Sequence, residues 1–133
     1  MRILLADDQA KVRSALRLLL EQEPELSVVG EVAEATSLLV QVQAIQPDLV
    51  LLDWELPGLG ARRPSAFPSR SPGLHLLSIL HSLGHPPKVI ALSGRPGAGE
   101  EALAAGADAF VSKGDPPERL LTTLHHVGCS GEN

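Results

Sequence analysis

Cysteine is nearly absent from this chain of 133 residues, and so are the long apolar runs of membrane proteins. The single Cys129 excludes a disulfide within the chain and fits a reducing compartment, so we expect a cytoplasmic protein. No apolar run approaches the roughly 20 residues that a membrane-spanning helix needs, and the first residues do not have the pattern of a signal peptide. We therefore expect no contact with a membrane.

Positive charge and aromatic side chains are too scarce for a nucleic-acid-binding surface. The chain has 11 Lys and Arg residues against 16 Asp and Glu residues, and its aromatic residues are one Trp and two Phe. Contacts with phosphates need clustered Lys and Arg, and contacts with unpaired bases need aromatic platforms. We expect no direct contact with nucleic acid by this chain.

The apolar residues that are present fall in short runs between helical patterns. Strands are predicted at residues 3–6, 26–32, 49–52, 89–92 and 109–111. These runs are continuously apolar, which indicates strands buried on both faces, as in a parallel sheet covered by helices. Helices are predicted around 12–19, over 37–45, 74–83 and 100–105, and from 115 onward. The pattern predicts a single small, doubly wound α/β domain.

Two helix boundaries carry specific signals. Gly106 follows the fourth predicted helix, where a glycine commonly ends a helix in the left-handed conformation. Asp115 is placed to cap the last helix, with Pro116 as its first residue and Glu118 three residues after the cap. We therefore predict that the last helix begins at Pro116.

Residues 57–72, PGLGARRPSAFPSRSP, break the alternation of strands and helices. The segment holds four prolines, three arginines, three serines and no acidic residue. Irregular loops longer than about 12–15 residues are uncommon in compact domains. We favour a mobile surface insertion; the alternative is a contact surface for an acidic partner, with Phe67 as its anchor.

Reactive side chains stand at the carboxyl ends of four of the five predicted strands. They are Asp7 and Asp8, Asp53, Ser93, and Lys113. Ligands of open parallel sheets bind at this edge, so we expect these side chains to share a site. The plainer alternative is that the Asp7–Asp8 pair only caps the next helix and that the others lie on the surface. That alternative does not explain why every one of these strand ends is reactive.

Three carboxylates at one point repel one another, which raises their pKa values unless a cation joins them. Mg²⁺ suits a site with few carboxylates and several waters, and Lys113 supplies a second positive charge. Ser93 adds a hydroxyl donor and Gly94 adds a backbone amide. Mg²⁺ and a lysine together stabilise a phosphoryl group in transfer, and an aspartate can be its nucleophile. The residues therefore indicate an aspartyl-phosphate at Asp53.

The segments LLADDQ, LVLLDWELPG, ALSG and DAFVSK occur in this order at the expected strand ends. With them the chain resembles the receiver domain of bacterial two-component response regulators, and residues 7–35 are most similar to receivers of LuxR-type regulators. The resemblance implies a flavodoxin-like α/β fold with a five-stranded parallel sheet of order 2-1-3-4-5. It places the receiver domain at 1–128, with an insertion at about 58–72, and leaves 129–133 as a tail or the start of a linker.

The resemblance also implies roles for individual residues. Asp53 would be the phosphoacceptor, and Mg²⁺ would be held by Asp7, Asp8, Asp53 and the backbone carbonyl of Glu55. The phosphoryl group would contact Lys113, Ser93, and the backbone amides of Trp54 and Gly94. Ser93 and Phe110 would be the switch residues. The family commonly has Tyr at the position of Phe110; because Phe has no hydroxyl, Phe110 could signal the activated state only through the position of its ring.

The function that this resemblance implies is a signalling switch and not an enzyme. A histidine kinase would phosphorylate Asp53 with Mg²⁺, and the domain would then switch an output domain or partner, in a transcriptional system. A second copy of the chain, in a homodimer, is a further expected partner. No output domain is expected within these residues. Two alternatives are a protein-binding pseudo-receiver and an aspartate-nucleophile phosphohydrolase, although the latter usually shows a DxDx(T/V) motif at its first strand.

Glu55 and Arg95 are candidates for a lid over the site. Glu55 lies two residues after Asp53, and Arg95 lies two residues after Ser93. Their opposite charges would pair across neighbouring strand ends and hinder the water that hydrolyses the phosphoryl group. The alternative is that both side chains extend into solvent, where such a pair contributes little.

Overall fold

The computed structural model of the chain describes residues 1–56 and 72–130, and the side chains of 72–75 and 129–130 are not described. The predictions for 57–71, including the anchor role of Phe67, lie outside the described residues. Within these ranges, no helix combines the length and the apolar character needed to cross a membrane.

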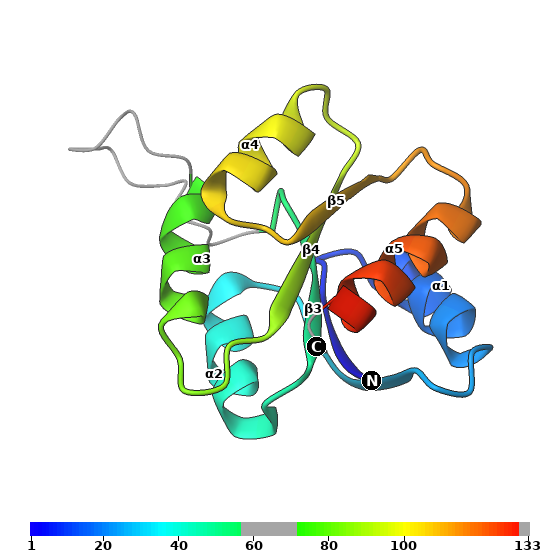
Figure 1. Cartoon of the computed structure of the whole chain (residues 1–133), viewed down its shortest axis with the longest axis horizontal. Helices are drawn as coiled ribbons and strands as arrows, with labels where there is room; N and C mark the ends of the chain where they lie inside the picture. Colours follow the sequence, from blue (N-terminus) through cyan, green and yellow to red (C-terminus); the bar gives the residue numbers. More distant parts are fainter. Residues whose placement is uncertain (57–71, 131–133) are drawn as a thin grey trace.

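The predicted sheet is confirmed, with five parallel strands in the order β2-β1-β3-β4-β5 (Figure 1). The strands are β1 (Arg2–Ala6), β2 (Ser27–Val32), β3 (Leu49–Asp53), β4 (Lys88–Ser93) and β5 (Ala109–Ser112). In the register of the sheet, Asp53 pairs with Leu92 and Ser93 pairs with Ser112. The ends of β3, β4 and β5 therefore lie level with one another at one edge.

Helices cover both faces of the sheet, as the continuously apolar strands predicted (Figure 1). Helices α1 (Ala10–Glu21) and α5 (Pro117–Ser130) cover one face, and α2 (Ala35–Ile45), α3 (Pro72–His81) and α4 (Ala98–Ala105) cover the other. The sheet has a hydrophobic core on each face, and successive strand residues point into opposite cores. Leu5 belongs to the core under α1 and α5, and Leu4 to the core under the other three helices.

The start of α5 differs from the prediction. The helix begins at Pro117, one residue later than predicted. The Asp115 carboxylate accepts a hydrogen bond from the Ser112 N–H at 3.2 Å, and the Asp115 N–H donates to the Ser112 carbonyl at 3.0 Å. Asp115 therefore closes the turn between β5 and α5. The helix continues to Ser130, two residues beyond the predicted domain end at 128. The predicted end of α4 is confirmed, since Gly106 has a φ of 114°.

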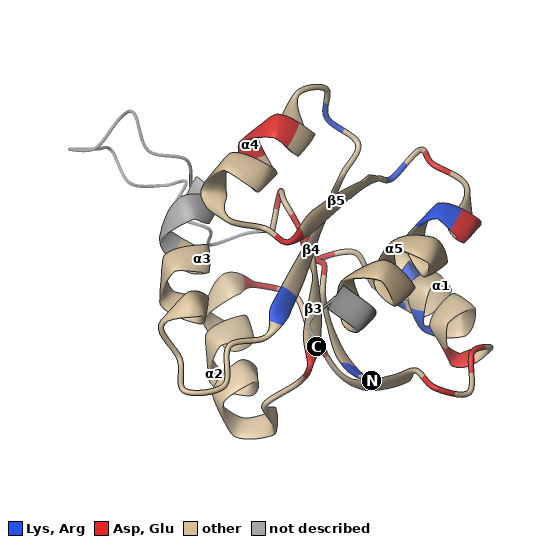
Figure 2. Ribbon diagram, viewed as in Figure 1, with Lys and Arg blue, Asp and Glu red and all other residues tan. Residues whose placement is uncertain are grey.

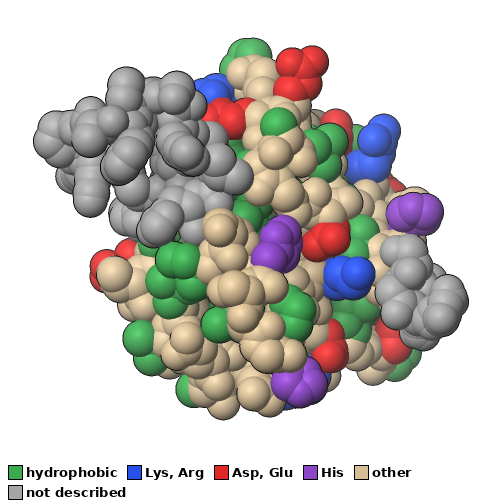
Figure 3. All heavy atoms as spheres, turned by 60° about the vertical axis from the view of Figure 1, so that its left-hand side comes forward, with side chains coloured by type: hydrophobic (Ala, Val, Ile, Leu, Met, Phe, Trp, Pro, Cys, Tyr) green, Lys and Arg blue, Asp and Glu red, His purple; other side chains and the backbone are tan. Residues whose placement is uncertain are grey.

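Helices α2 and α4 lie on the same face of the sheet but differ in charge, since α4 holds Glu100 and Glu101. Helix α2 has no charged residue, and Figure 2 shows its ribbon entirely in the colour of uncharged residues. Among the described side chains of α2, α3 and α4, Val40 and Leu103 are the most exposed large hydrophobic ones. Figure 3 turns this side forward and shows hydrophobic side chains as separate spots, with acidic, basic and histidine side chains on the same face.

Candidate functional site

Asp7, Asp53 and Lys113 meet at the carboxyl edge of the sheet, each at or just beyond the end of a strand. The Lys113 ammonium Nζ lies 3.2 Å from Asp7 Oδ2 and 3.3 Å from Asp53 Oδ1. Both carboxylates are almost fully buried, with side-chain exposures of 2% and 3%. The structure therefore brings together three of the side chains that the sequence predicted to share a site.

A tight turn after β1 fixes the position of Asp7. Its Oδ1 accepts a hydrogen bond from the Gln9 N–H at 2.9 Å, and its backbone carbonyl accepts one from Arg13 Nη1 at 2.6 Å. The N-cap residue of α1 is Gln9, and its side chain makes no capping hydrogen bond. The Asp7–Asp8 pair is therefore not the helix cap of the plainer alternative.

Burial shapes the electrostatics of Asp53. Burial raises the pKa of this carboxyl above its ordinary value, and the neighbouring Asp7 carboxylate adds to the rise. The Glu55 N–H, which donates to Asp53 Oδ1 at 3.0 Å, and the Lys113 ammonium act in the opposite direction. Burial alone would lower the pKa of Lys113, but attraction to Asp53 and Asp7 raises it overall, so this amine stays charged. The single Lys113 ammonium therefore does not fully compensate for the burial of Asp53 and its repulsion by Asp7, and the pKa of Asp53 stays raised.

Asp8 adds a third carboxylate, and it is the exposed member of the cluster. One carboxylate oxygen each from Asp7, Asp8 and Asp53 lies within 4.8 Å of the others. Oxygen ligands of this kind, with one side open to water, suit Mg²⁺, which retains several waters when it binds. The donor set therefore fits the expected Mg²⁺ site. The backbone carbonyl of Glu55 stays a prediction as a further ligand.

The Ser93 hydroxyl, predicted to contact the phosphoryl group, is hydrogen bonded to Glu55 in this structure. Ser93 ends β4 and is 1% exposed. Its Oγ lies 3.0 Å and 2.8 Å from the two carboxylate oxygens of Glu55. The backbone N–H of Arg95 donates to the same Oγ at 3.0 Å. The hydroxyl proton is therefore directed toward Glu55.

Glu55 and Arg95, predicted as a lid pair, are brought together with a separation of 3.2 Å between Arg95 Nε and Glu55 Oε2. Arg95 Nη2 also lies 2.9 Å from Glu101 Oε1 in α4. Sequence reasoning missed Glu101 and the hydrogen bond between Ser93 and Glu55. No sequence signal marks Glu101 as the partner of Arg95, whereas the pairing of β3 with β4 could have revealed that Glu55 reaches Ser93.

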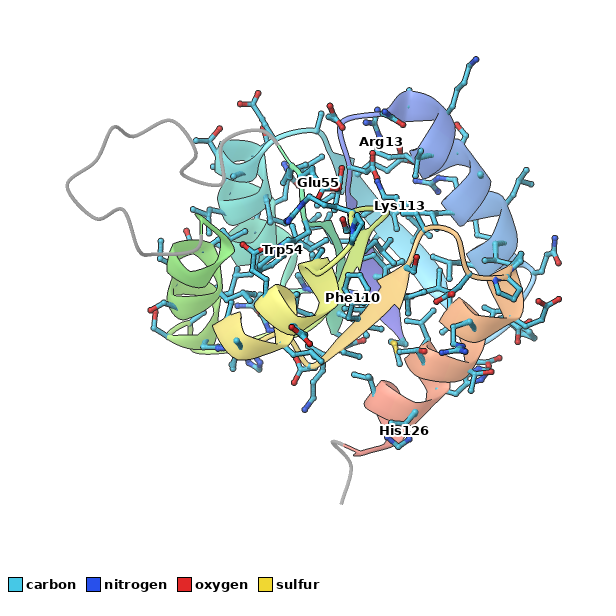
Figure 4. The ribbon with its side chains drawn as sticks, turned by 90° about the horizontal axis from the view of Figure 1, so that it is seen from above. Arg13, Trp54, Glu55, Phe110, Lys113 and His126 are labelled. Atoms are coloured by element: carbon cyan, nitrogen blue, oxygen red, sulfur yellow. The ribbon has the colours of Figure 1, made fainter. Side chains whose placement is uncertain are left out.

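The two backbone amides predicted to bind phosphoryl oxygens differ in their surroundings. The Trp54 N–H donates to the Leu92 carbonyl at 2.8 Å, so the sheet and not the site uses this donor here. Gly94 lies beside Lys113, since a Cβ added to Gly94 would come within 4.0 Å of Lys113 Cβ. Figure 4 shows Glu55 and Lys113 near the centre of this edge and Trp54 on the side of α3 and α4.

Phe110, the predicted switch aromatic, lies in β5 against the first turn of α4 (Figure 4). Its half-buried ring packs on the core under α2, α3 and α4. A Cβ added to Gly99 would approach Phe110 Cδ2 to 3.0 Å. The helix reaches the ring this closely because residue 99 has no side chain.

A mostly apolar groove of about 450 Å³ lies between α1 and α5 and reaches Lys113. Val12 and Leu16 of α1 and Leu120 of α5 are among its lining residues. The groove therefore places an apolar surface directly beside the charged site.

Comparison with known proteins agrees with this geometry. The family profile of the response regulator receiver domain matches residues 3–125. The chain belongs to this family. Receiver domains of this family interact with histidine kinases and with output domains.

Curated relatives of this receiver domain include longer regulators. It is 32% identical over 127 residues to the nitrate/nitrite response regulator protein NarL of Escherichia coli K12, which covers 94% of this chain and 53% of NarL. It is likewise 32% identical over 124 residues to the uncharacterized transcriptional regulatory protein YhcZ of Bacillus subtilis, covering 92% of this chain and 53% of YhcZ. The chain thus spans about half the length of these relatives.

Solved structures give the same family. A DNA-binding response regulator of the LuxR family from Staphylococcus aureus superposes with a TM-score of 0.76 at 25% identity, covering 95% of this chain and 97% of the other. A LuxR-family two-component response regulator from Aurantimonas sp. SI85-9A1 gives 0.76 at 26% identity, covering 97% and 85%.

The crowded carboxylates predict that Mg²⁺ stabilises the fold. A ligand that binds only the folded state at about 100 times its Kd adds about 2.7 kcal/mol to the free energy of unfolding. Thermal melts with and without Mg²⁺ should show a Tm higher by several degrees for wild type, and a smaller rise for Asp8→Ala. Glu118→Ala removes an exposed acid of α5 and should keep the full rise. A wild-type Tm that does not respond to Mg²⁺ would contradict the site.

Proposed function

We propose that this receiver domain is a phosphoacceptor switch in which Asp53 takes a phosphoryl group from a histidine kinase. The observation that carries the proposal is the contact of Lys113 with both Asp7 and Asp53 at the edge of the sheet. Mg²⁺, held by Asp7, Asp8, Asp53 and the Glu55 carbonyl, would neutralise negative charge on the transferring phosphoryl group when bound.

The proposed transfer assigns a role to each group at the edge of the sheet. A carboxylate oxygen of Asp53 attacks phosphorus as the bond from phosphorus to the imidazole nitrogen of the donor breaks. The electron pair of that bond stays with the nitrogen, which takes up a proton. Lys113 pairs with a phosphoryl oxygen, and Ser93 and the Gly94 amide donate to others in the activated state.

A phosphoacceptor switch needs a donor protein and an output domain or partner. The groove between α1 and α5 offers an apolar surface beside Lys113 for a donor protein. The similarity to NarL and to LuxR-family regulators supports a transcriptional output domain or partner, with a receiver boundary near residue 128 and a cytoplasmic location. In this proposal the chain catalyses no reaction on other molecules, a second copy is among its partners, and it makes no direct contact with nucleic acid.

The two alternative functions have less support. A pseudo-receiver that never accepts a phosphoryl group would be expected to lack one of the site residues, yet Asp53, Lys113 and the Asp7–Asp8 pair are all in place. A phosphohydrolase of the DxD type needs a second aspartate two residues after the first. Gln9 stands at that position in this chain.

Incubation with acetyl phosphate and Mg²⁺ should add one phosphoryl group to the intact protein. Asp53→Asn removes the nucleophile but keeps the size of the side chain, so this variant should gain nothing. The measurement is intact-protein mass spectrometry, with Asp48→Asn as the matched control for an aspartate at the opposite end of β3. Equal phosphorylation of the Asp53→Asn variant would rule out Asp53 as the acceptor.

The Glu55–Arg95 pair should slow loss of the phosphoryl group by hindering the hydrolytic water. Both side chains are nearly half exposed, so the pair is worth at most about 1 kcal/mol, which corresponds to decay up to about fivefold faster without it. The decay of phosphorylated protein after donor removal is measured for Glu55→Ala, Arg95→Ala, the double variant and an Arg119→Ala control. Wild-type rates in all variants would eliminate the lid, and slower decay in the double variant would mean that the pair orients the water.

A further inference from the structure

The Ser93 hydroxyl has one proton to donate, and in this structure Glu55 receives it. A serine side chain carries a single O–H donor. Its oxygen lies 2.8 Å and 3.0 Å from the two oxygens of the Glu55 carboxylate, and it already accepts the N–H of Arg95. Donation to Glu55 therefore excludes donation to a phosphoryl oxygen on Asp53 at the same time.

The Glu55 carboxylate is held in the position where it receives this proton. Arg95 lies between two acids, with Nε 3.2 Å from Glu55 Oε2 and Nη2 2.9 Å from Glu101 Oε1 in the first turn of α4. The guanidinium is thereby anchored on α4 while it holds Glu55. Because Glu55 and Arg95 have side-chain exposures of 44% and 48%, this arrangement is weak enough to be exchanged for a better acceptor.

We propose that Glu55 gates the switch hydroxyl. Glu55 accepts the hydrogen bond of the Ser93 hydroxyl while Asp53 is unmodified, and a phosphoryl group on Asp53 must displace Glu55 as the acceptor of that hydrogen bond. The gate rests on the proposed function, since without a phosphoryl group on Asp53 no competing acceptor exists. A phosphoryl group carries more negative charge than a carboxylate, and it would be attached to the buried Asp53 whereas Glu55 is nearly half exposed, so it is the stronger acceptor. Arg95 is a positioning residue that acts through Glu55.

The proposed gate would regulate activation of the domain. Glu55 sets how readily the domain enters its activated state, because its hydrogen bond to Ser93 opposes that state. This effect is separate from the rate of dephosphorylation, which depends on access of water. A phosphoryl mimic that is not hydrolysed therefore tests the gate without interference from the lid.

Beryllofluoride with Mg²⁺ is the probe, and its affinity is measured by fluorine NMR and by the fluorescence of the single tryptophan, Trp54, beside Asp53. Glu55→Ala should tighten binding about threefold to tenfold, since it removes a charge-assisted hydrogen bond at a half-exposed position. Ser93→Ala should weaken binding. In the Ser93→Ala background, Glu55→Ala should change the affinity by less than about twofold, because sites that act through one another are not additive.

Equal tightening by Glu55→Ala in both backgrounds would overturn the gate, because Glu55 would then act only through its charge. Unchanged or weaker binding by Glu55→Ala in the wild-type background would overturn it as well. If wild type binds no beryllofluoride, the proposed function fails and the gate fails with it. Glu100→Gln is the matched control: it removes an exposed negative charge from the first turn of α4 and should leave the affinity within about twofold.

Discussion

The contact of the Lys113 ammonium with the Asp7 and Asp53 carboxylates is the interaction on which the rest of the site depends. Lys113 and Asp7 are 106 residues apart in the sequence and meet only because β1, β3 and β5 are parallel strands of one sheet. A single ammonium faces three carboxylates, and the pKa of Asp53 stays raised despite it. The fold therefore keeps an excess of negative charge at one edge, which a bound divalent cation would offset.

Helix α4 contacts residues from two strand ends of this edge. Its first turn pairs Glu101 with Arg95 and, at Gly99, touches the ring of Phe110. The first contact comes from the end of β4 and the second from β5, so two predicted switch regions meet on one short helix. An exchange of hydrogen bonds at Ser93 is thus only two contacts away from α4.

The residues alone were sufficient to predict a parallel sheet covered by helices and the clustering of reactive side chains at its edge, whereas the strand order came from the resemblance to receiver domains. Continuously apolar runs indicate parallel strands, and residues at the ends of such strands must meet at one edge; this logic placed Asp7, Asp53 and Lys113 together. The hydrogen bond between Ser93 and Glu55 was missed, although the pairing of β3 with β4 brings the two residues near each other. Which acceptor the hydroxyl takes depends on side-chain conformations, which sequence patterns do not give. Asp115 shows the same limit, since the sequence predicted it as a helix cap and its carboxylate accepts a hydrogen bond from the Ser112 N–H in the preceding turn.

Chemical localisation of the phosphoryl group tests the assignment of Asp53 most directly. Borohydride reduces an aspartyl-phosphate to homoserine, so the modified position is found by peptide mass spectrometry after treatment with acetyl phosphate, Mg²⁺ and then borohydride. The predicted result is homoserine at residue 53 and unchanged aspartates at 7 and 8. Homoserine at residue 7 or 8, with Asp53 intact, would contradict the assignment.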